Sequence, residues 1–183
     1  YCNFFLYFCA KKSIIMTVLY LVRHGETVDN ANKIMQGQTQ GELNTKGIEQ
    51  ARTVAKNLKS EHFDAIVSSD LKRSFDTASI IAEPHGLTVI TTPLLRERDW
   101  GGFTGRYIPD LKDEPWPDDI ESLDALKSRA LEFLNFIRTT FPNQKVLAVG
   151  HGIINKAIQA VYYGKPMNEI LKMDNAEVRI LHI

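Results

Sequence analysis

Histidine, arginine and carboxylate side chains follow several short apolar runs of this chain. Arg23-His24-Gly25 directly follows one run, and Gly150-His151-Gly152 directly follows another. Arg73 comes shortly after a further run, and Glu97 follows yet another. Because ligands of open α/β sheets bind at the carboxyl ends of the strands, we expect these side chains to meet in one pocket.

These residue types together suit the transfer of a phosphoryl group. Guanidinium groups bind phosphoryl oxygens bidentately and keep their charge near neutral pH. A neutral imidazole can attack phosphorus, and a carboxylic acid can protonate a departing alkoxide. With cations around the phosphoryl oxygens, we expect no metal and no other cofactor. A metal site on His24 and His151 is not favoured, because neither has a recognisable ligand spacing and the arginines would repel a cation.

Short apolar strands alternate with amphipathic helices along the chain. This alternation predicts an α/β fold, a three-layer sandwich with a mostly parallel central sheet flanked by helices. We expect Thr45 and Asp70 to cap the first two helices. The expected strands cover 17–22, 63–68, 87–91, 145–149 and 178–182, and the expected helices cover 45–59, 71–83, 123–140 and the stretch after Gly152 to about Tyr163.

Two polar segments are expected to lack regular structure. Residues 26–44 form a long glycine-containing loop, a feature that is uncommon unless it is functional. Residues 107–121 carry three prolines and six acids against the single Lys112, which predicts an irregular, exposed insertion.

Composition restricts the class of protein and its partners. The chain has 183 residues, 44% of them apolar, which is enough to bury one ordinary core. Its 22 basic and 22 acidic side chains cancel, so neither nucleic acid nor an anionic membrane is an expected partner. The two cysteines, Cys2 and Cys9, leave the rest of the chain without a disulfide framework, so a cytoplasmic location is expected.

The first 15 residues are expected to stand apart from the domain. Tyr1 to Ala10 are mostly apolar, but Lys11 and Lys12 follow that stretch, the reverse of a secretory signal. Ten residues are also fewer than the roughly 20 that span a bilayer. Met16 stands directly before the first strand, so we predict that residues 1–15 are an extension, either not native or disordered, and that 16–183 form a single domain.

Five motifs occur in a characteristic order. They are Leu-Val-Arg-His-Gly-Glu-Thr at 21–27 with Asn30, Leu-Asn-Thr-Lys-Gly at 43–47, Ser-Ser-Asp-Leu-Lys-Arg at 68–73, Leu-Arg-Glu at 95–97 and Val-Gly-His-Gly at 149–152. In this order they resemble the signatures of the histidine phosphatase superfamily, in its cofactor-dependent, phosphoglycerate mutase-like branch. The resemblance runs from about Thr17 to the C-terminus, and Asp174-Asn175-Ala176 is similar to the family's late asparagine-containing segment.

The resemblance implies a role for each matching residue. His24 would be the nucleophile that becomes phosphohistidine, with Arg23 and Arg73 binding the phosphoryl oxygens. His151 would donate a hydrogen bond to phosphate. Glu97 would protonate the leaving group and later activate water. The implied phosphate- or substrate-binding set also includes Asn30, Gln36 and Gly152.

Some assignments stay open on the sequence alone. Glu26 and Asp99 are alternative candidates for the acid, although the Gly-Phe-Thr-Gly stretch at 102–105 resembles the family pattern that follows Glu97. Lys156 stands where relatives often have arginine, which keeps the charge but loses the planar fork. The oligomeric state is undetermined, and an oligomer is possible.

The reaction is expected to be hydrolysis of a small phosphorylated metabolite. Family mutases resemble one another in a longer insertion with adjacent arginines, whereas this chain has Arg98, an isolated Arg106 and then the acidic segment. Acids near the entrance would disfavour substrates with several negative groups, so we expect a phosphomonoester with a neutral or cationic remainder. A phosphoglycerate mutase is the alternative. An inactive phospho-ligand-binding member would be expected to lack His24, an arginine or Glu97, and all are present.

Overall fold

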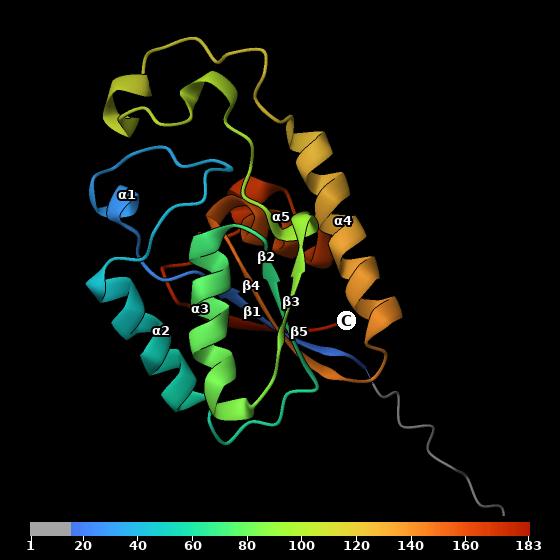
Figure 1. Cartoon of the computed structure of the whole chain (residues 1–183). Helices are drawn as coiled ribbons and strands as arrows, with labels where there is room; N and C mark the ends of the chain where they lie inside the picture. The colour runs from blue at the N-terminus through green and yellow to red at the C-terminus, as the bar shows by residue number, and fades with distance from the viewer. Residues whose placement is uncertain (1–15) are drawn as a thin grey trace, which may run out of the picture.

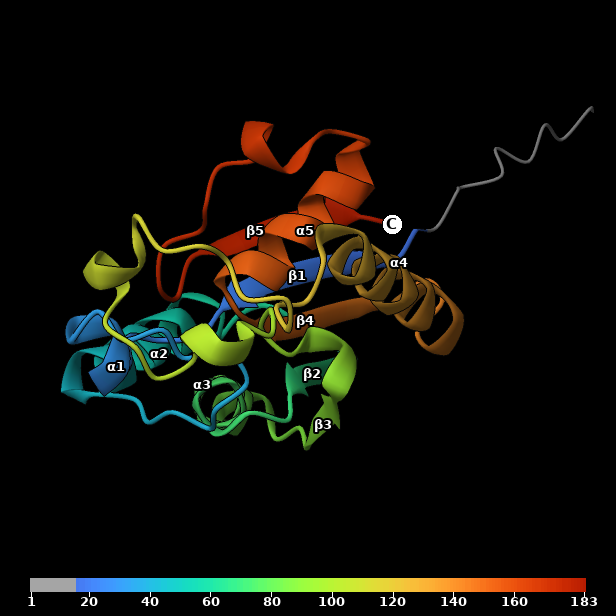
Figure 2. The same cartoon turned by 90° about the horizontal axis from the view of Figure 1, so that it is seen from above.

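The computed structural model describes residues 16–183 and arranges them in three layers (Figure 1). The prediction made for residues 1–15 therefore lies outside the described residues. The middle layer is a five-stranded sheet, and Figure 2 shows helices over both of its faces. The predicted α/β fold with a mostly parallel central sheet is confirmed. Within residues 16–183, no helix has the length and apolar content needed to cross a membrane.

The sheet has the strand order β3-β2-β4-β1-β5. The strands are β1 (Val18–Arg23), β2 (Ala65–Ser69), β3 (Val89–Thr92), β4 (Lys145–Gly150) and β5 (Val178–His182). The first four are parallel, and β5 pairs antiparallel with β1 at one edge. In the central pair Arg23 lies opposite Gly150, so His24 and His151 each come one residue after the last paired position.

Alternating side chains of the central strands supply two separate cores. Leu19 and Leu21 of β1 face one side and pack with helices α4 (Leu123–Thr140) and α5 (Gly152–Tyr163). Tyr20 and Val22 face the other side and pack with α2 (Thr45–Asn57) and α3 (Lys72–Ala82). Because both faces are covered, these strands are continuous apolar runs, as parallel sheets require.

The predicted caps of the first two long helices are wrong. Helix α2 is capped by Asn44, whose side chain accepts a hydrogen bond from the Gly47 amide at 2.8 Å, and Thr45 is already inside the helix. Helix α3 begins after Leu71 without a side-chain cap. The Asp70 carboxylate instead binds the Arg96 guanidinium, with 2.8 Å between Oδ1 and Nε.

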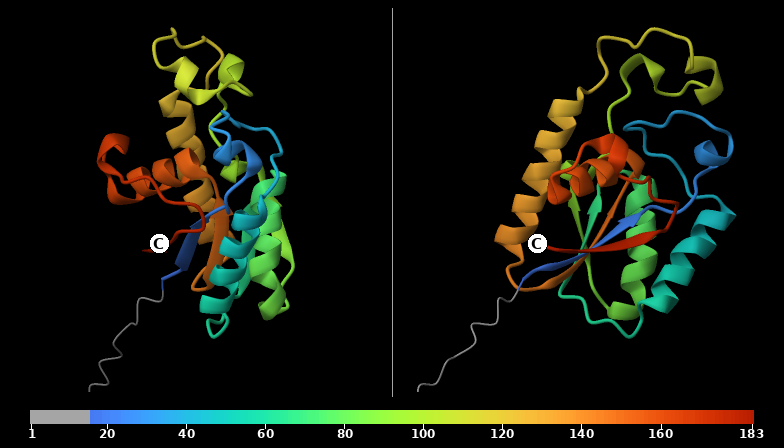
Figure 3. Two further views of the ribbon diagram at one scale, coloured as in Figure 1. Left: turned by 90° about the vertical axis from the view of Figure 1, so that its left-hand side faces the viewer. Right: turned by 180° about the vertical axis from the view of Figure 1, so that it is seen from behind.

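The two segments predicted to be irregular contain short helices and pack against each other. The segment 26–44 includes α1 (Val28–Ala31), and the segment 107–121 includes a 3₁₀ turn at Ile108–Leu111. Residues 99–121, here called the cap, comprise this second segment and a preceding stretch with a 3₁₀ turn at Gly101–Phe103. Further 3₁₀ turns occupy Glu83–His85, Pro93–Leu95 and Met167–Glu169. The Met35 amide donates to the Arg106 carbonyl at 2.9 Å, and the Gly105 amide donates to the Met35 carbonyl at 2.7 Å. Both segments lie above the same end of the sheet (Figure 3).

Candidate active site

A pocket of about 240 Å³ lies at the carboxyl ends of the central strands. Of the residues expected at the site, all except His151 line this pocket: Arg23, His24, Asn30, Gln36, Arg73, Glu97 and Gly152. His151 is fully buried directly beside it, with its ring centroid 5.0 Å from that of His24. The parallel pairing of β1 with β4 brings the two histidines together.

His24 is held as a neutral imidazole with a defined tautomer. Its Nδ1 lies 2.7 Å from the Gly25 carbonyl oxygen, which can only accept, so Nδ1 carries the proton. Burial, Arg73 and Arg23 lower the pKa of His24 well below the ordinary value of 6.5. The ring nitrogen left with a free lone pair is therefore Nε2, the atom that a nucleophile needs.

Two arginines stand beside this ring and are themselves fixed by backbone oxygens. Arg23 donates from Nη1 to the Met173 carbonyl at 2.7 Å. Arg73 is 1% exposed and donates from Nη2 to the Gly37 carbonyl at 2.8 Å. Burial lowers the pKa of Arg73 to about 10, so it keeps its positive charge at neutral pH. Both guanidinium groups are thus pre-oriented before any ligand arrives.

Unpartnered polar atoms gather around the same point. Within the part of the chain that the structure describes, the buried side-chain atoms without a hydrogen-bond partner include Arg23 Nε, Arg73 Nε, Gln36 Oε1 and both ring nitrogens of His151. Leaving such atoms unpaired costs free energy, so their concentration at one place is unusual for a merely structural cluster. Two charged donors and an imidazole that can also donate form a site for an anion with several oxygens.

Glu97 places its carboxylate between this cluster and the start of α5. Its Oε1 accepts from the amides of Ile153 at 3.0 Å and Ile154 at 3.1 Å. A methyl group on Gly152, the first residue of α5, would lie 3.5 Å from Arg23 Nε and 3.6 Å from Glu97 Oε2. The Glu97 carboxylate and the Arg23 guanidinium therefore face the same small space.

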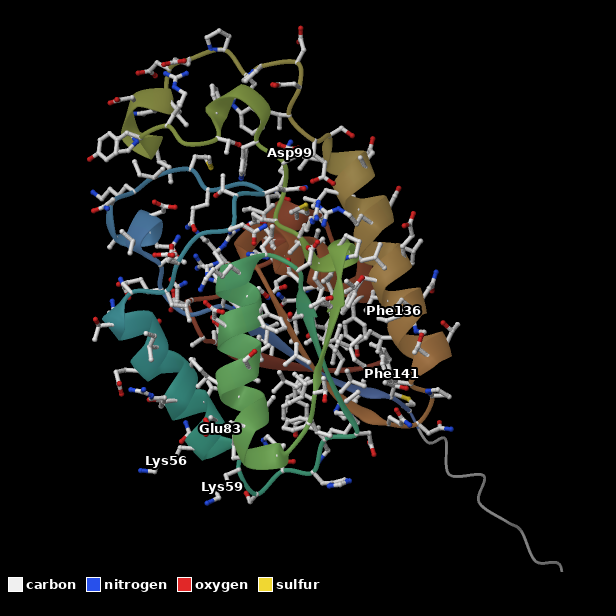
Figure 4. The ribbon with its side chains drawn as sticks, viewed as in Figure 1. Lys56, Lys59, Glu83, Asp99, Phe136 and Phe141 are labelled. Atoms are coloured by element: carbon white, nitrogen blue, oxygen red, sulfur yellow. The ribbon has the colours of Figure 1, made fainter. Side chains whose placement is uncertain are left out.

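The two alternative acids do not line the pocket. Glu26 is held by Lys46, with 2.7 Å between Oε2 and Nζ, and by the Asn44 side chain. Asp99 lies at the base of the cap, near the beginning of α4 (Figure 4), and accepts from the Gly101 amide at 2.9 Å. Glu97 is thus the acid that the geometry favours.

Asn30 and Gln36 extend the pocket along the loop after His24. The Asn30 side-chain oxygen accepts from the Thr27 amide and from Asn175, both at 3.3 Å, so its amide group remains for a ligand. Asn175 also donates to the His24 carbonyl at 3.0 Å. The sequence motif around Asn175 thus holds the backbone of His24 and the side chain of Asn30.

Lys172 is a pocket residue that the sequence did not reveal. It lines the pocket, and burial of its ammonium group together with Arg23 lowers its pKa. It stands in a polar loop between α5 and β5, where a single lysine has no distinguishing pattern. Lys156, by contrast, is absent from the pocket lining.

The acids of the cap do not line the pocket, and three of them are held by other partners. Glu114 pairs with Arg106, Glu121 pairs with Arg129, and Asp119 accepts from the Gly102 amide at 3.1 Å. The cap contributes Trp100 and Ile108 to the pocket lining instead. The expectation that acids would line the entrance therefore finds no support in the positions of these residues.

The described residues also contain no group of three or more histidine, cysteine, aspartate or glutamate side chains arranged to hold a metal ion. The charged groups that line the pocket with His24 are three cations, Arg23, Arg73 and Lys172, and one acid, Glu97.

A family model for the histidine phosphatase superfamily (branch 1) matches residues 19–183. The chain belongs to this superfamily. It is 36% identical over 166 residues to the uncharacterized phosphatase PhoE of Bacillus subtilis, covering 88% of this chain and 86% of the relative. It is 35% identical over 165 residues to the probable phosphoglycerate mutase GpmB of Yersinia pestis, covering 82% of this chain and 77% of the relative.

Solved structures of histidine phosphatases share the fold. A mycobacterial glucosyl-3-phosphoglycerate phosphatase superposes with a TM-score of 0.83 at 29% identity, covering 89% of this chain and 91% of that one. A phosphoserine phosphatase of Entamoeba histolytica, solved with 3-phosphoglyceric acid, superposes with a TM-score of 0.81 at 26% identity, covering 90% of each chain. The relatives thus include proteins named as phosphatases and one named as a probable mutase.

Proposed function

We propose that this histidine phosphatase hydrolyses small phosphomonoesters, without a metal, through a phosphohistidine formed on His24. The observation that carries the proposal is the neutral His24 ring, with Nε2 free, beside two fixed arginines and facing the space that Glu97 also borders. Three cationic side chains line that pocket and can stabilise the charge on a transferring phosphoryl group.

The reaction follows in two steps. First, His24 Nε2 attacks phosphorus and the bond to the substrate oxygen breaks, while the protonated Glu97 gives its proton to the departing alkoxide. Next, the Glu97 carboxylate takes a proton from water as the water oxygen attacks the phosphohistidine. Inorganic phosphate leaves, His24 returns to its neutral form and Glu97 is protonated again.

The positions of two arginines favour hydrolysis over transfer to a second hydroxyl. A mutase needs free cations for a second acidic group of its substrate. Arg98 is 5% exposed and its guanidinium lies over the rings of Trp100 and Trp116, and Arg106 is paired with Glu114. Neither arginine lines the pocket. We therefore place hydrolysis first.

Lys172 supports a phosphoglycerate mutase as the second candidate. It is a cation that lines the pocket without belonging to the predicted phosphoryl-binding set, so it could hold a carboxylate of the substrate. The apolar part of the wall, formed by Ile34, Met35, Trp100 and Ile108, favours a neutral remainder instead. An amine on the substrate would meet no acid there other than Glu97.

A screen of phosphomonoesters in the presence of EDTA tests the proposal. We expect phosphate release by the wild type and none by His24→Ala, with a preference for phosphoserine over fructose bisphosphate. Interconversion of 2- and 3-phosphoglycerate, assayed in parallel, measures the mutase alternative. Turnover by His24→Ala would contradict the nucleophile, loss of activity with EDTA would contradict metal independence, and mutase turnover faster than hydrolysis would reverse the ranking.

A further inference from the structure

Arg129 of α4 binds the backbone of the segment that carries Glu97. Its side chain is 17% exposed. Nη1 donates to the carbonyls of Leu94 at 3.1 Å and Arg96 at 2.6 Å, and Nη2 donates to the Glu97 carbonyl at 3.4 Å. One guanidinium thus holds three carbonyls within four consecutive residues, and a planar five-donor group is suited to that task.

The same guanidinium also binds the end of the cap. Arg129 Nε donates to Glu121 Oε1 at 3.0 Å, and Nη2 donates to Oε2 at 2.7 Å. Glu121 in turn closes the base of the cap, because its amide donates to the Asp99 carbonyl at 3.0 Å and its carboxylate accepts from the Asp99 amide at 3.1 Å. Arg129 therefore joins the two ends of the cap to the segment 94–97.

The carboxylate of Glu97 is fixed independently of Arg129. It accepts hydrogen bonds from amides at the start of α5. Glu97 is therefore held at its carboxylate by α5 and at its backbone carbonyl by Arg129 of α4. General acid catalysis requires the proton to lie within hydrogen-bond reach of the leaving oxygen, and a small displacement lowers the rate severely.

We infer that Arg129 is a positioning residue for Glu97, and that its ion pair with Glu121 fixes the position of the cap relative to the general acid. Arg129 does not line the pocket, so it acts through Glu97 and not on the substrate. The inference rests on the proposed function, in which Glu97 protonates the leaving group.

Leaving-group dependence separates this role from a merely structural one. p-Nitrophenolate is a stable anion that departs without a proton, whereas the alkoxide of benzyl phosphate needs one. We expect Arg129→Gln to lower kcat/KM for benzyl phosphate about tenfold to a hundredfold, a part of the roughly hundredfold to ten-thousandfold that general acid catalysis supplies. For p-nitrophenyl phosphate, kcat/KM should fall less than about threefold, because this parameter covers only the steps up to phosphohistidine formation.

Matched variants make the comparison decisive. Arg138→Gln removes an exposed arginine of the same helix and should leave both substrates unaffected. Glu121→Gln keeps the Arg129 contacts with the carbonyls and should produce a smaller loss with the same leaving-group dependence. In the double variant Arg129→Gln with Glu97→Gln, the two losses on benzyl phosphate should not multiply, because both act on one group.

Two outcomes would contradict a positioning role for Arg129. Equal losses on the two substrates would mean that Arg129 only maintains the fold, and multiplicative losses in the double variant would mean that it acts apart from Glu97. If Arg129→Gln does not fold, as judged by its thermal transition, Arg129→Lys and Glu121→Gln carry the same two-substrate test. Absence of wild-type turnover on both substrates would instead reject the proposed function, which distinguishes the two failures.

Discussion

Gly152 is the residue on which three charged side chains of the pocket converge. It opens α5, and the space next to its Cα borders Arg23, Glu97 and Lys172. The backbone there does not require glycine, because its φ lies outside the left-handed range. What glycine provides at this position is room between these three side chains, where the proposed function places the phosphoryl group.

We predict that Gly152→Ala weakens phosphate binding without harming the fold. The added methyl group would make ordinary contacts with Arg23 Nε at 3.5 Å and Lys172 Cε at 3.6 Å, so nothing must move, but it would occupy space that the anion uses. We expect the affinity for inorganic phosphate, measured by titration calorimetry, to fall about tenfold, a change of about 1.4 kcal/mol. The melting temperature should stay within a few degrees.

The control for this substitution is Gly102→Ala in the cap, where the nearest atom would be Pro117 Cγ at 3.7 Å. It adds the same methyl group outside the phosphoryl-binding cluster and should bind phosphate like the wild type. An unchanged affinity in Gly152→Ala would show that the phosphoryl group lies elsewhere in the pocket.

Residues in contiguous motifs could be predicted from the sequence, and residues that reach the site singly could not. The Arg-His-Gly and Gly-His-Gly triplets end buried strands, so their place in the pocket follows from the parallel sheet. Arg129 resembles any charged residue on a helix surface, because nothing in the sequence links it to its partners in the segment 94–97, more than 30 positions away. Lys172 likewise reaches the pocket only because the long loop between α5 and β5 folds back to the end of β1.

At the scale of elements, the turn after β1 and the first turn of α2 are in direct backbone contact. A Cβ atom on Gly25 would lie 2.4 Å from the Gly47 carbonyl oxygen, and a Cβ atom on Gly47 would lie 2.0 Å from the Glu26 carbonyl oxygen. Backbone atoms cannot rotate away as a flexible side chain can. This contact explains why a glycine stands in the motif 43–47, far in sequence from His24.

We predict that Gly47→Ala destabilises the protein and lowers its activity. The methyl group would push α2 away from the turn that orients His24, an overpacking that costs about 3 kcal/mol. For a chain of this size the loss corresponds to a fall of roughly 6–12 °C in melting temperature. Circular dichroism melting and phosphatase kinetics should show both effects.

Thr53→Ala, an exposed substitution on the same helix, provides the reference and should melt close to the wild type. If Gly47→Ala also melted within about two degrees of the wild type, the backbone contact between the turn and α2 would not be as tight as described.

Element types were predictable from periodicity, but the caps of two helices were not. Asn44 and Thr45 are adjacent and both can cap, so local chemistry does not decide between them. Asp70 is also a good capping residue, yet it is taken by Arg96, 26 positions away. A long-range ion pair of this kind leaves no local pattern. Helix α1 is only four residues long and is fixed by a capping box between Thr27 and Asn30.

At the scale of the whole molecule, a chain without net charge concentrates cations and imidazoles in one interior region. His24 and His151 are 3% and 0% exposed, and both have a pKa well below the ordinary 6.5, first because of burial and then because of Arg73. The overall balance of charges could be read from the sequence, whereas this concentration arises only when the strands assemble.

Folding stability should therefore fall as the pH falls below about 6.5. In the unfolded chain each histidine takes up a proton there, while in the folded protein both stay neutral, so the unfolded state binds more protons and gains free energy. At pH 5 the loss amounts to at most about 2 kcal/mol for each histidine. Above pH 7 this contribution is constant. Melting temperatures measured from pH 5 to 7.5 in phosphate-free buffers should follow this course.

His151→Gln isolates the contribution of one buried imidazole, because glutamine is polar and does not titrate. We expect a melting temperature that depends less steeply on pH between 5 and 6.5 than in the wild type, whatever the variant's absolute stability. His62→Gln is the matched control, since the His62 side chain is 90% exposed, and its slope should equal that of the wild type. Equal slopes in all three proteins would mean that His151 takes up its proton in the folded state, and then the buried cluster would not hold its imidazoles neutral.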